Sequence, residues 1–268
     1  MPEQTLVHVY PDPSVLGHVY QPRLGILSGV RSFAAALGAA APVRTARWGG
    51  WASAARADYD AWSQPPPAGG SPTEVDLGEV VVTLRAELPD DAIICNGAGN
   101  YTVWVHRFFR YRRWGTQLAP QSGAMGYGIP AALAAQLLHP ERTVVAFAGD
   151  GCFQMCGQEL ATMIQERLPI IVIVANNRML ATIRMHQERR FPGRVIGTDL
   201  VNPDFAELGR AFGLHAERVE RRDEFPAALA RARATAGPAL IELLTDPQAL
   251  TPTASLSETR AQAEAARV

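Results

Sequence analysis

The sequence contains no lysine: all 25 of its basic residues are arginine. This absence excludes a phosphate-binding P-loop, which needs a lysine, and any mechanism that passes through a lysine Schiff base. An excess of charge is also lacking, because 26 acidic residues leave a formal net charge of −1. A near-neutral chain gives no electrostatic footprint for nucleic acid or for an anionic membrane surface. We therefore expect neither as a partner.

Cysteine and long apolar runs are scarce as well. Cys95, Cys152 and Cys156 lie in apolar or motif stretches, which is typical of reduced, buried thiols. Cys152 and Cys156 have no second ligand pair at zinc spacing, so a core position is favoured over a zinc site. We recognise no signal peptide and no apolar run of membrane-spanning length. These absences predict a cytoplasmic protein that does not cross a membrane.

The stretch 143–177 carries the strongest pattern in the chain. Residues 143–148 and 170–174 are short, β-branched apolar runs, which are typical of buried parallel strands. Between them, apolar residues recur at helical spacing over 153–168, and Pro169 is expected to end that helix. The pattern predicts a strand–helix–strand unit with parallel strands, whose carboxyl ends lie at one edge of the sheet.

Polar residues stand where each of these strands ends. Asp150 follows the first strand and Asn177 the second, so we expect both at the sheet edge where α/β proteins bind ligands. Their oxygens are hard ligands of the kind that Mg²⁺ accepts together with phosphate oxygens. Gly149 and Gly151 remove side chains where a phosphate would approach. The alternative is a pair of ordinary loop turns. A dinucleotide site is disfavoured, because Gln154 stands where its third glycine would be.

Two motifs carry a family resemblance. The sequence GDG, then 24 residues, then NN resembles the binding motif of enzymes that depend on thiamine diphosphate (ThDP). The segment GAMGYGIPAALAAQ at 123–136 is similar to the matching part of acetolactate synthases. The resemblance implies ThDP and Mg²⁺ as cofactors, with Asp150, the Asn177 side chain and the Met179 main-chain carbonyl as metal ligands. It implies that the Gly123 carbonyl receives the 4′-amino group of the cofactor and that Met125 holds the cofactor bent.

The resemblance also implies a set of residues around the diphosphate. They are Asn100, Tyr101, Gly149, Gly151 and Cys152. His186 stands where acetolactate synthases have a tryptophan that shapes the substrate pocket, and a surface histidine is the alternative reading. Arg178 brings a cation near the metal loop, where it would either help the diphosphate or crowd Mg²⁺.

The expected fold is α/β, with a doubly wound, mainly parallel sheet and helices on both faces. We expect a remnant of a middle domain at 1–38, a connector at 39–75 broken by its proline run, the ThDP-binding domain at 76–250 and a polar, helical tail at 251–268. Strands are also predicted at 5–9, 24–27, 92–95, 215–219 and 239–244, and helices at 30–37, 77–88, 125–138 and 224–235.

The segment from Arg178 to Thr198 is polar and is predicted to be an irregular, mobile part of the site. Asn202 is predicted to cap the following helix, with Pro203 at its first position. Gly213 is expected to end that helix.

The implied activity is decarboxylation of a pyruvate-like 2-oxo acid followed by carboligation. The glutamate that activates ThDP belongs to an N-terminal, pyrimidine-binding domain, so we assign no catalytic residue to this chain. That domain is expected from a partner chain or a longer protein, in a homo- or hetero-oligomer. The alternatives are a decarboxylase without carboligation and a non-catalytic module that binds ThDP and Mg²⁺.

Overall fold

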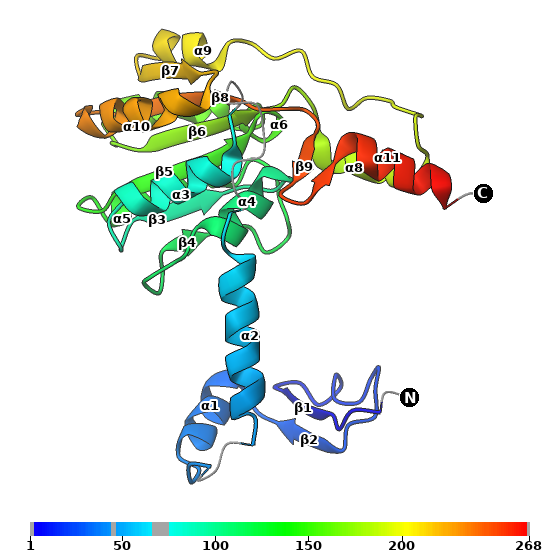
Figure 1. Cartoon of the computed structure of the whole chain (residues 1–268). Coiled ribbons are helices and arrows are strands. Elements are labelled where there is room, and N and C mark those ends of the chain that lie inside the picture. Colours follow the sequence, from blue (N-terminus) through cyan, green and yellow to red (C-terminus); the bar gives the residue numbers. More distant parts are fainter. Residues whose placement is uncertain (1–2, 44–46, 66–74, 267–268) are drawn as a thin grey trace. The chain divides into compact units, whose positions relative to one another are not determined.

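The computed structural model describes residues 3–43, 47–65 and 75–266. The chain divides into two compact units, Met1–Ala57 and Asp58–Val268. In the first unit, β1 (Val7–Tyr10) and β2 (Leu24–Leu27) pair in parallel and are followed by α1 (Val30–Gly38) (Figure 1). Helix α2 (Gly49–Trp62) crosses the boundary between the units. The predicted strands and first helix are confirmed. The predicted break at 65–70 lies, apart from Pro65, outside the described residues.

The second unit is built on one parallel sheet of six strands in the order β4-β3-β5-β6-β8-β7 (Figure 1). The strands are β3 (Ile93–Asn96), β4 (Gln117–Leu118), β5 (Val144–Gly149), β6 (Ile171–Asn176), β7 (His215–Val219) and β8 (Ala239–Leu244). Every hydrogen-bonded pair of neighbours runs parallel. Strands β5 and β6 lie in the middle, and all their residues are buried. Burial on both faces explains why these two strands are continuous apolar runs.

Helices cover both faces of the sheet. One face packs against α3 (Leu77–Glu87), α4 (Tyr101–Phe108) and α10 (Phe225–Ala234), and the other against α5 (Gly128–Leu138), α7 (Leu160–Gln165) and α9 (Phe205–Ala211). Alternate residues of β5 serve the two layers: Val145 and Phe147 belong to the first cluster, Val144 and Ala146 to the second. The predicted doubly wound α/β fold is therefore confirmed.

The predicted single helix over 153–168 is wrong. The chain instead forms α6 (Asp150–Phe153), a 3₁₀ turn η1 (Gly157–Glu159) and α7. The Phe153 ring lies 2.8 Å from where a Cβ of Gly157 would be, so the chain turns back closely over that ring. Helix α7 ends before Pro169, because Arg167 adopts a left-handed φ of 53° and the Leu168 N–H bonds to the Met163 carbonyl.

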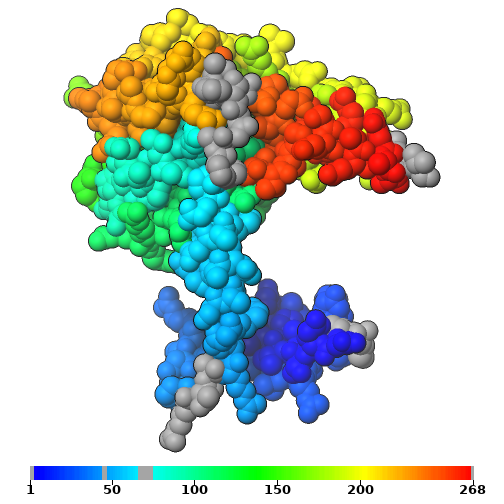
Figure 2. Space-filling view, in the orientation of Figure 1, coloured from blue at the N-terminus to red at the C-terminus, as the bar shows by residue number. Residues whose placement is uncertain are grey.

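The polar segment after Asn177 is also more regular than predicted, because α8 (Ala181–Arg190) occupies most of it. This helix packs on the C-terminal elements β9 (Ala249–Thr251) and α11 (Leu256–Ala265), which are joined through β10 (Ala254–Ser255). The helix expected in the tail is confirmed as α11, which protrudes in red from one side of the second unit (Figure 2). Among the residues described, no helix has the length and apolarity to span a membrane.

Candidate functional site

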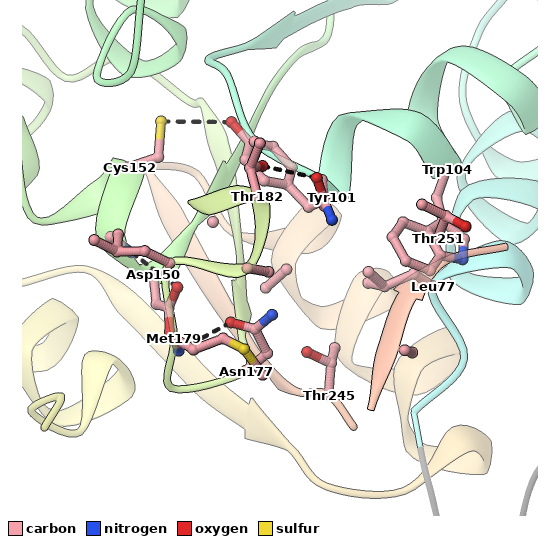
Figure 3. A pocket seen from close by; sticks show the side chains of 18 of the residues that line it. Leu77, Tyr101, Trp104, Asp150, Cys152, Asn177, Met179, Thr182, Thr245 and Thr251 are labelled. Atoms are coloured by element: carbon pink, nitrogen blue, oxygen red, sulfur yellow. Dashed lines mark hydrogen bonds between the residues drawn. The ribbon is translucent and has the colours of Figure 1, made fainter. Parts of the chain in front are cut away.

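The carboxyl ends of β5 and β6 bring the two principal site residues together. The strands are paired in a register that sets Gly149 opposite Ala175. Asp150 directly follows β5, and Asn177 directly follows β6. Both line one cavity of about 250 Å³, in which their side chains lie at the same end as Met179 (Figure 3). The strand–helix–strand reading of the sequence thus placed both residues at the correct sheet edge.

Nearly all of the predicted site residues line this one cavity. They are Asn100, Tyr101, Met125, Gly149, Asp150, Gly151, Cys152, Asn177 and Met179. The exception is Gly123, which lies in the loop before α5 with a left-handed φ of 67° and is not part of the lining. His186 is exposed on α8 and also lies outside the lining.

Asp150 is a buried carboxylate with a specific set of donors. Only 3% of the residue is exposed. Its Oδ1 accepts a hydrogen bond from the Gly151 N–H at 2.8 Å, and its Oδ2 accepts one from Asn202 Nδ2 at 2.8 Å. Burial raises the pKa of Asp150 above its ordinary value, and these hydrogen bonds oppose that rise. Among the described residues no arginine forms an ion pair with it, so a bound cation would stabilise the ionised form.

Asn177 and Met179 belong to a tight loop at the tip of β6. Asn177 Oδ1 accepts a hydrogen bond from the Met179 N–H at 3.2 Å, and the Met179 carbonyl accepts one from the Ala181 N–H at 3.0 Å. Each oxygen keeps a second lone pair for another partner. Arg178 between them adopts a left-handed φ of 58°. Its side chain is exposed and does not line the cavity.

Two glycines allow close packing at the end of β5. A Cβ at Gly149 would lie 2.8 Å from the Tyr101 ring, and one at Gly151 would lie 2.6 Å from Leu180 Cδ2. Side chains at these positions would fill the space in front of the strand tip. Their absence leaves that space open at this end of the cavity.

Tyr101 and Cys152 form the wall beside the glycines. The Tyr101 ring stacks on Phe147, with 5.9 Å between the ring centroids, and its hydroxyl donates to Cys152 Sγ at 3.4 Å (Figure 3). Burial raises the pKa of the Tyr101 hydroxyl well above its usual value. The Gly126 N–H also donates to Cys152 Sγ, at 3.0 Å. The thiol is therefore a buried acceptor within the wall.

The remaining thiols behave as the sequence predicts. Cys95 and Cys156 are free and buried, and burial raises the pKa of each to about 12. They are packing residues rather than ligands.

The structure corrects the predicted role of Asn202. The side chain that caps α9 is that of Asp204, which accepts a hydrogen bond from the Glu207 N–H at 2.8 Å. Asn202 instead donates to Asp150 and to Asn176 Oδ1, each at 2.8 Å. The sequence held a signal for this: two cap-type residues flank Pro203, and one helix needs only one of them.

A residue of α8 also contributes to the site and was missed. Thr182 lines the cavity, and its Oγ1 donates to Asn100 Oδ1 at 2.7 Å. A polar helix without apolar periodicity gives no sequence signal for such a contact.

The residues present fit a magnesium–diphosphate group. One carboxylate, one amide oxygen and one main-chain carbonyl are too few for an all-protein cage, but they suit Mg²⁺ that also binds phosphates and water. In the described part of the chain, no group of three or more histidine, cysteine, aspartate or glutamate residues is arranged to hold a metal ion by itself. A parallel sheet with an acidic residue and small residues at its central strand tips defines the class of α/β proteins that bind phosphorylated cofactors there.

Comparison with known proteins identifies the family. Residues 97–243, more than half of the chain, match the family described as thiamine pyrophosphate enzyme, C-terminal TPP binding domain. The chain belongs to this family.

Several relatives carry the name acetolactate synthase. The large subunit from Corynebacterium glutamicum is 32% identical over 247 residues, covering 87% of this chain and 38% of the relative. The isozyme 2 large subunit from Escherichia coli is 28% identical, covering 91% and 44%. Acetolactate synthase 1 from Oryza sativa is 30% identical, covering 89% and 39%. The chain thus spans less than half the length of these relatives.

Proposed function

We propose that this chain binds ThDP and Mg²⁺ and, together with an N-terminal domain supplied from elsewhere, decarboxylates a pyruvate-like 2-oxo acid with carboligation. One observation carries the proposal: Asp150 and Asn177 stand at the tips of two neighbouring parallel strands and line one cavity. The similarity to acetolactate synthases supports the choice of reaction.

Three oxygens would hold the metal. They are the Asp150 carboxylate, the Asn177 side-chain oxygen and the Met179 carbonyl. Asn100, Tyr101, Gly149, Gly151 and Cys152 line the same cavity and would surround the diphosphate. Tyr101, Gly149, Gly151 and Cys152 are largely buried, and a charged group held among buried residues is screened less by solvent.

The pyrimidine end of the cofactor would lie toward the loop before α5. Met125 lines the cavity and is positioned to support the cofactor from one side. The Gly123 carbonyl would receive the amino group. When bound, ThDP supplies the electron sink for decarboxylation, while the protein supplies binding and orientation. The activating glutamate is proposed to come from the N-terminal domain.

The partner is proposed from the relatives' lengths. Because this chain covers 38% and 44% of two acetolactate synthase subunits, the rest of such an enzyme has no counterpart in it. We propose that a pyrimidine-binding domain, in a longer protein or on a partner chain, completes the site in an oligomer.

A product assay tests this proposal. The chain is mixed with a separately expressed N-terminal domain of an acetolactate synthase large subunit, pyruvate, ThDP and Mg²⁺. We expect acetolactate from the mixture and no turnover by the chain alone. Acetaldehyde without acetolactate would identify a decarboxylase without carboligation. ThDP binding without turnover in any pairing would identify a non-catalytic module and contradict the proposal.

A further inference from the structure

A row of hydrogen-bonded polar side chains runs from Asp150 across the sheet, through the half-buried Asn202. Asn202 donates to both Asp150 and Asn176, as described above. Asn176 Nδ2 in turn donates to Glu242 Oε1 at 2.7 Å. Asn176 and Glu242 are both buried, and Glu242 has no exposed surface. This row of side chains thus links the tips of β5 and β6 to the interior of β8.

Glu242, at the far end of this row of side chains, is held only by hydrogen-bond donors. Glu242 Oε2 accepts hydrogen bonds from Arg218 Nε at 3.1 Å and from the Ala206 N–H at 3.3 Å. Arg218 also pairs with Asp204, the residue that caps α9, at 2.7 Å. Glu242 is therefore fixed between β7, α9 and Asn176, and it offers that asparagine only acceptor oxygens.

These contacts fix the orientation of two amide groups. Because a carboxylate accepts and does not donate, Asn176 turns its NH₂ toward Glu242 and its Oδ1 toward Asn202. That oxygen needs a donor, so Asn202 presents its NH₂, which also reaches Asp150. On the other side, Gln154 Nε2 donates to Asn202 Oδ1 at 2.6 Å. Each side-chain amide in this row has one orientation that gives every neighbour a hydrogen bond.

We propose that Glu242 is a positioning residue for the magnesium site: through Asn176 and Asn202 it keeps an N–H donor facing the Asp150 carboxylate. This inference rests on the proposed binding of Mg²⁺ at Asp150. Without the constraint from Glu242, reversal of both amides is opposed at Asn176 by the Arg178 N–H, which donates to Asn176 Oδ1 at 3.2 Å, a longer contact than the 2.7 Å bond to Glu242. After such a reversal, Asn202 would present a carbonyl oxygen to a carboxylate oxygen, and two acceptors at that distance repel. The carboxylate would turn away from the geometry that binds the metal.

The first test replaces Glu242 with its isosteric amide. In Glu242→Gln, the new NH₂ can face Asn176 and permits the reversed orientation. Mg²⁺ is titrated at a fixed, high ThDP concentration and followed by tryptophan fluorescence, since Trp104 lines the cavity. We expect the Mg²⁺ concentration at half-saturation to rise about tenfold, the lower end of effects seen for groups that orient metal ligands.

Glu217→Gln is the matched control, because Glu217 lies on the adjacent strand β7 and pairs with Arg231 outside this row of side chains. The Mg²⁺ concentration at half-saturation should be the same in this control as in wild type. An unchanged value in Glu242→Gln, with the fold intact by circular dichroism, would overturn the inference.

A double-substitution cycle separates positioning from general weakening of the fold. If Glu242 acts through Asn202, then Asn202→Ala and the double variant should share the same Mg²⁺ half-saturation. If the fold-change in the double variant instead equals the product of the fold-changes in the two single variants, Glu242 acts by another route and the inference is wrong.

An exposed position gives a further test. In Gln154→Glu, the new carboxylate favours reversal of Asn202, whereas Glu242, acting through Asn176, opposes that reversal. We therefore expect Gln154→Glu to raise the Mg²⁺ concentration at half-saturation more in the Glu242→Gln background than in the wild-type background, by about tenfold. An equal effect in the two backgrounds would contradict the inference. Failure of the wild-type chain to bind Mg²⁺ with ThDP would instead refute the proposed function.

Discussion

At the scale of single residues, Gly128 faces main-chain atoms where a side chain would lie. A Cβ there would lie 2.9 Å from the Gly97 nitrogen and 3.0 Å from the Asn96 carbonyl carbon. Both atoms belong to the backbone at the end of β3 and cannot rotate aside. Gly128→Ala is therefore expected to lower the free energy of unfolding by about 1–3 kcal/mol, despite the better helix propensity of alanine.

Urea unfolding measures this effect, with Gly237→Ala as the control because nothing lies within 4 Å of its Cβ position. The control is expected to stay within about 0.5 kcal/mol of wild type. Equal urea midpoints for Gly128→Ala and wild type would show that the backbone at the end of β3 moves to accommodate the methyl group, and they would contradict this prediction.

Residue types at strand ends were the predictable part of the site. Asp150, Asn177 and the flanking glycines follow apolar runs, and parallel pairing then determines where they meet. Asn202 and Glu242 could not be found in this way. Their roles depend on which side chains face each other across three strands and a loop, and spacing along the sequence does not encode that.

At the scale of elements, Glu188 joins α8 to α11. It is fully buried and pairs with Arg184 at 2.9 Å and with Arg260 at 2.6 Å. The hydrogen bond from Arg260 is the main cause that lowers the pKa of Glu188 from 4.5 to about 2. A carboxylate whose pKa is lower in the folded state contributes stability above its unfolded pKa and loses it as pH falls toward the folded value.

We therefore expect the stability difference between wild type and Glu188→Gln to depend on pH. Near neutral pH, wild type should be more stable by up to about 3 kcal/mol, and the difference should shrink between roughly pH 4.5 and pH 2. Thermal unfolding of both proteins across this range measures it. Glu207→Gln, which removes an exposed pair with Arg210, is the control and should differ little from wild type.

A stability difference between wild type and Glu188→Gln that stays constant from pH 6 to pH 3 would contradict the assigned role of Glu188 between α8 and α11.

The failure to predict α8 has a physical cause. Its ten residues include three arginines, and only Ala181, Met185 and Glu188 are buried, so no apolar stripe marks the helix. Tertiary packing against α11 and the Glu188 ion pairs stabilise it instead. The break between α6 and α7 was hidden for the opposite reason, because apolar residues continue at helical spacing through a turn made by Gly157.

At the scale of the whole molecule, the sheet was predictable because its central strands are buried on both faces. Such strands are continuous β-branched runs, and the crossovers between them must be right-handed and parallel. The two-residue strands β4 and β10 are too short to leave a pattern. Strand order and the covering of the cavity by C-terminal residues, such as Thr251, depend on long-range packing.

The most direct measurement of the central claim is a calorimetric titration of ThDP with and without Mg²⁺. The account predicts that the wild-type chain binds ThDP only when Mg²⁺ is present and that Asp150→Ala abolishes this binding while keeping its fold. Asp90→Ala, which alters an exposed acidic residue, should bind as wild type does. Equal ThDP affinity for wild type and Asp150→Ala in the presence of Mg²⁺ would contradict the account.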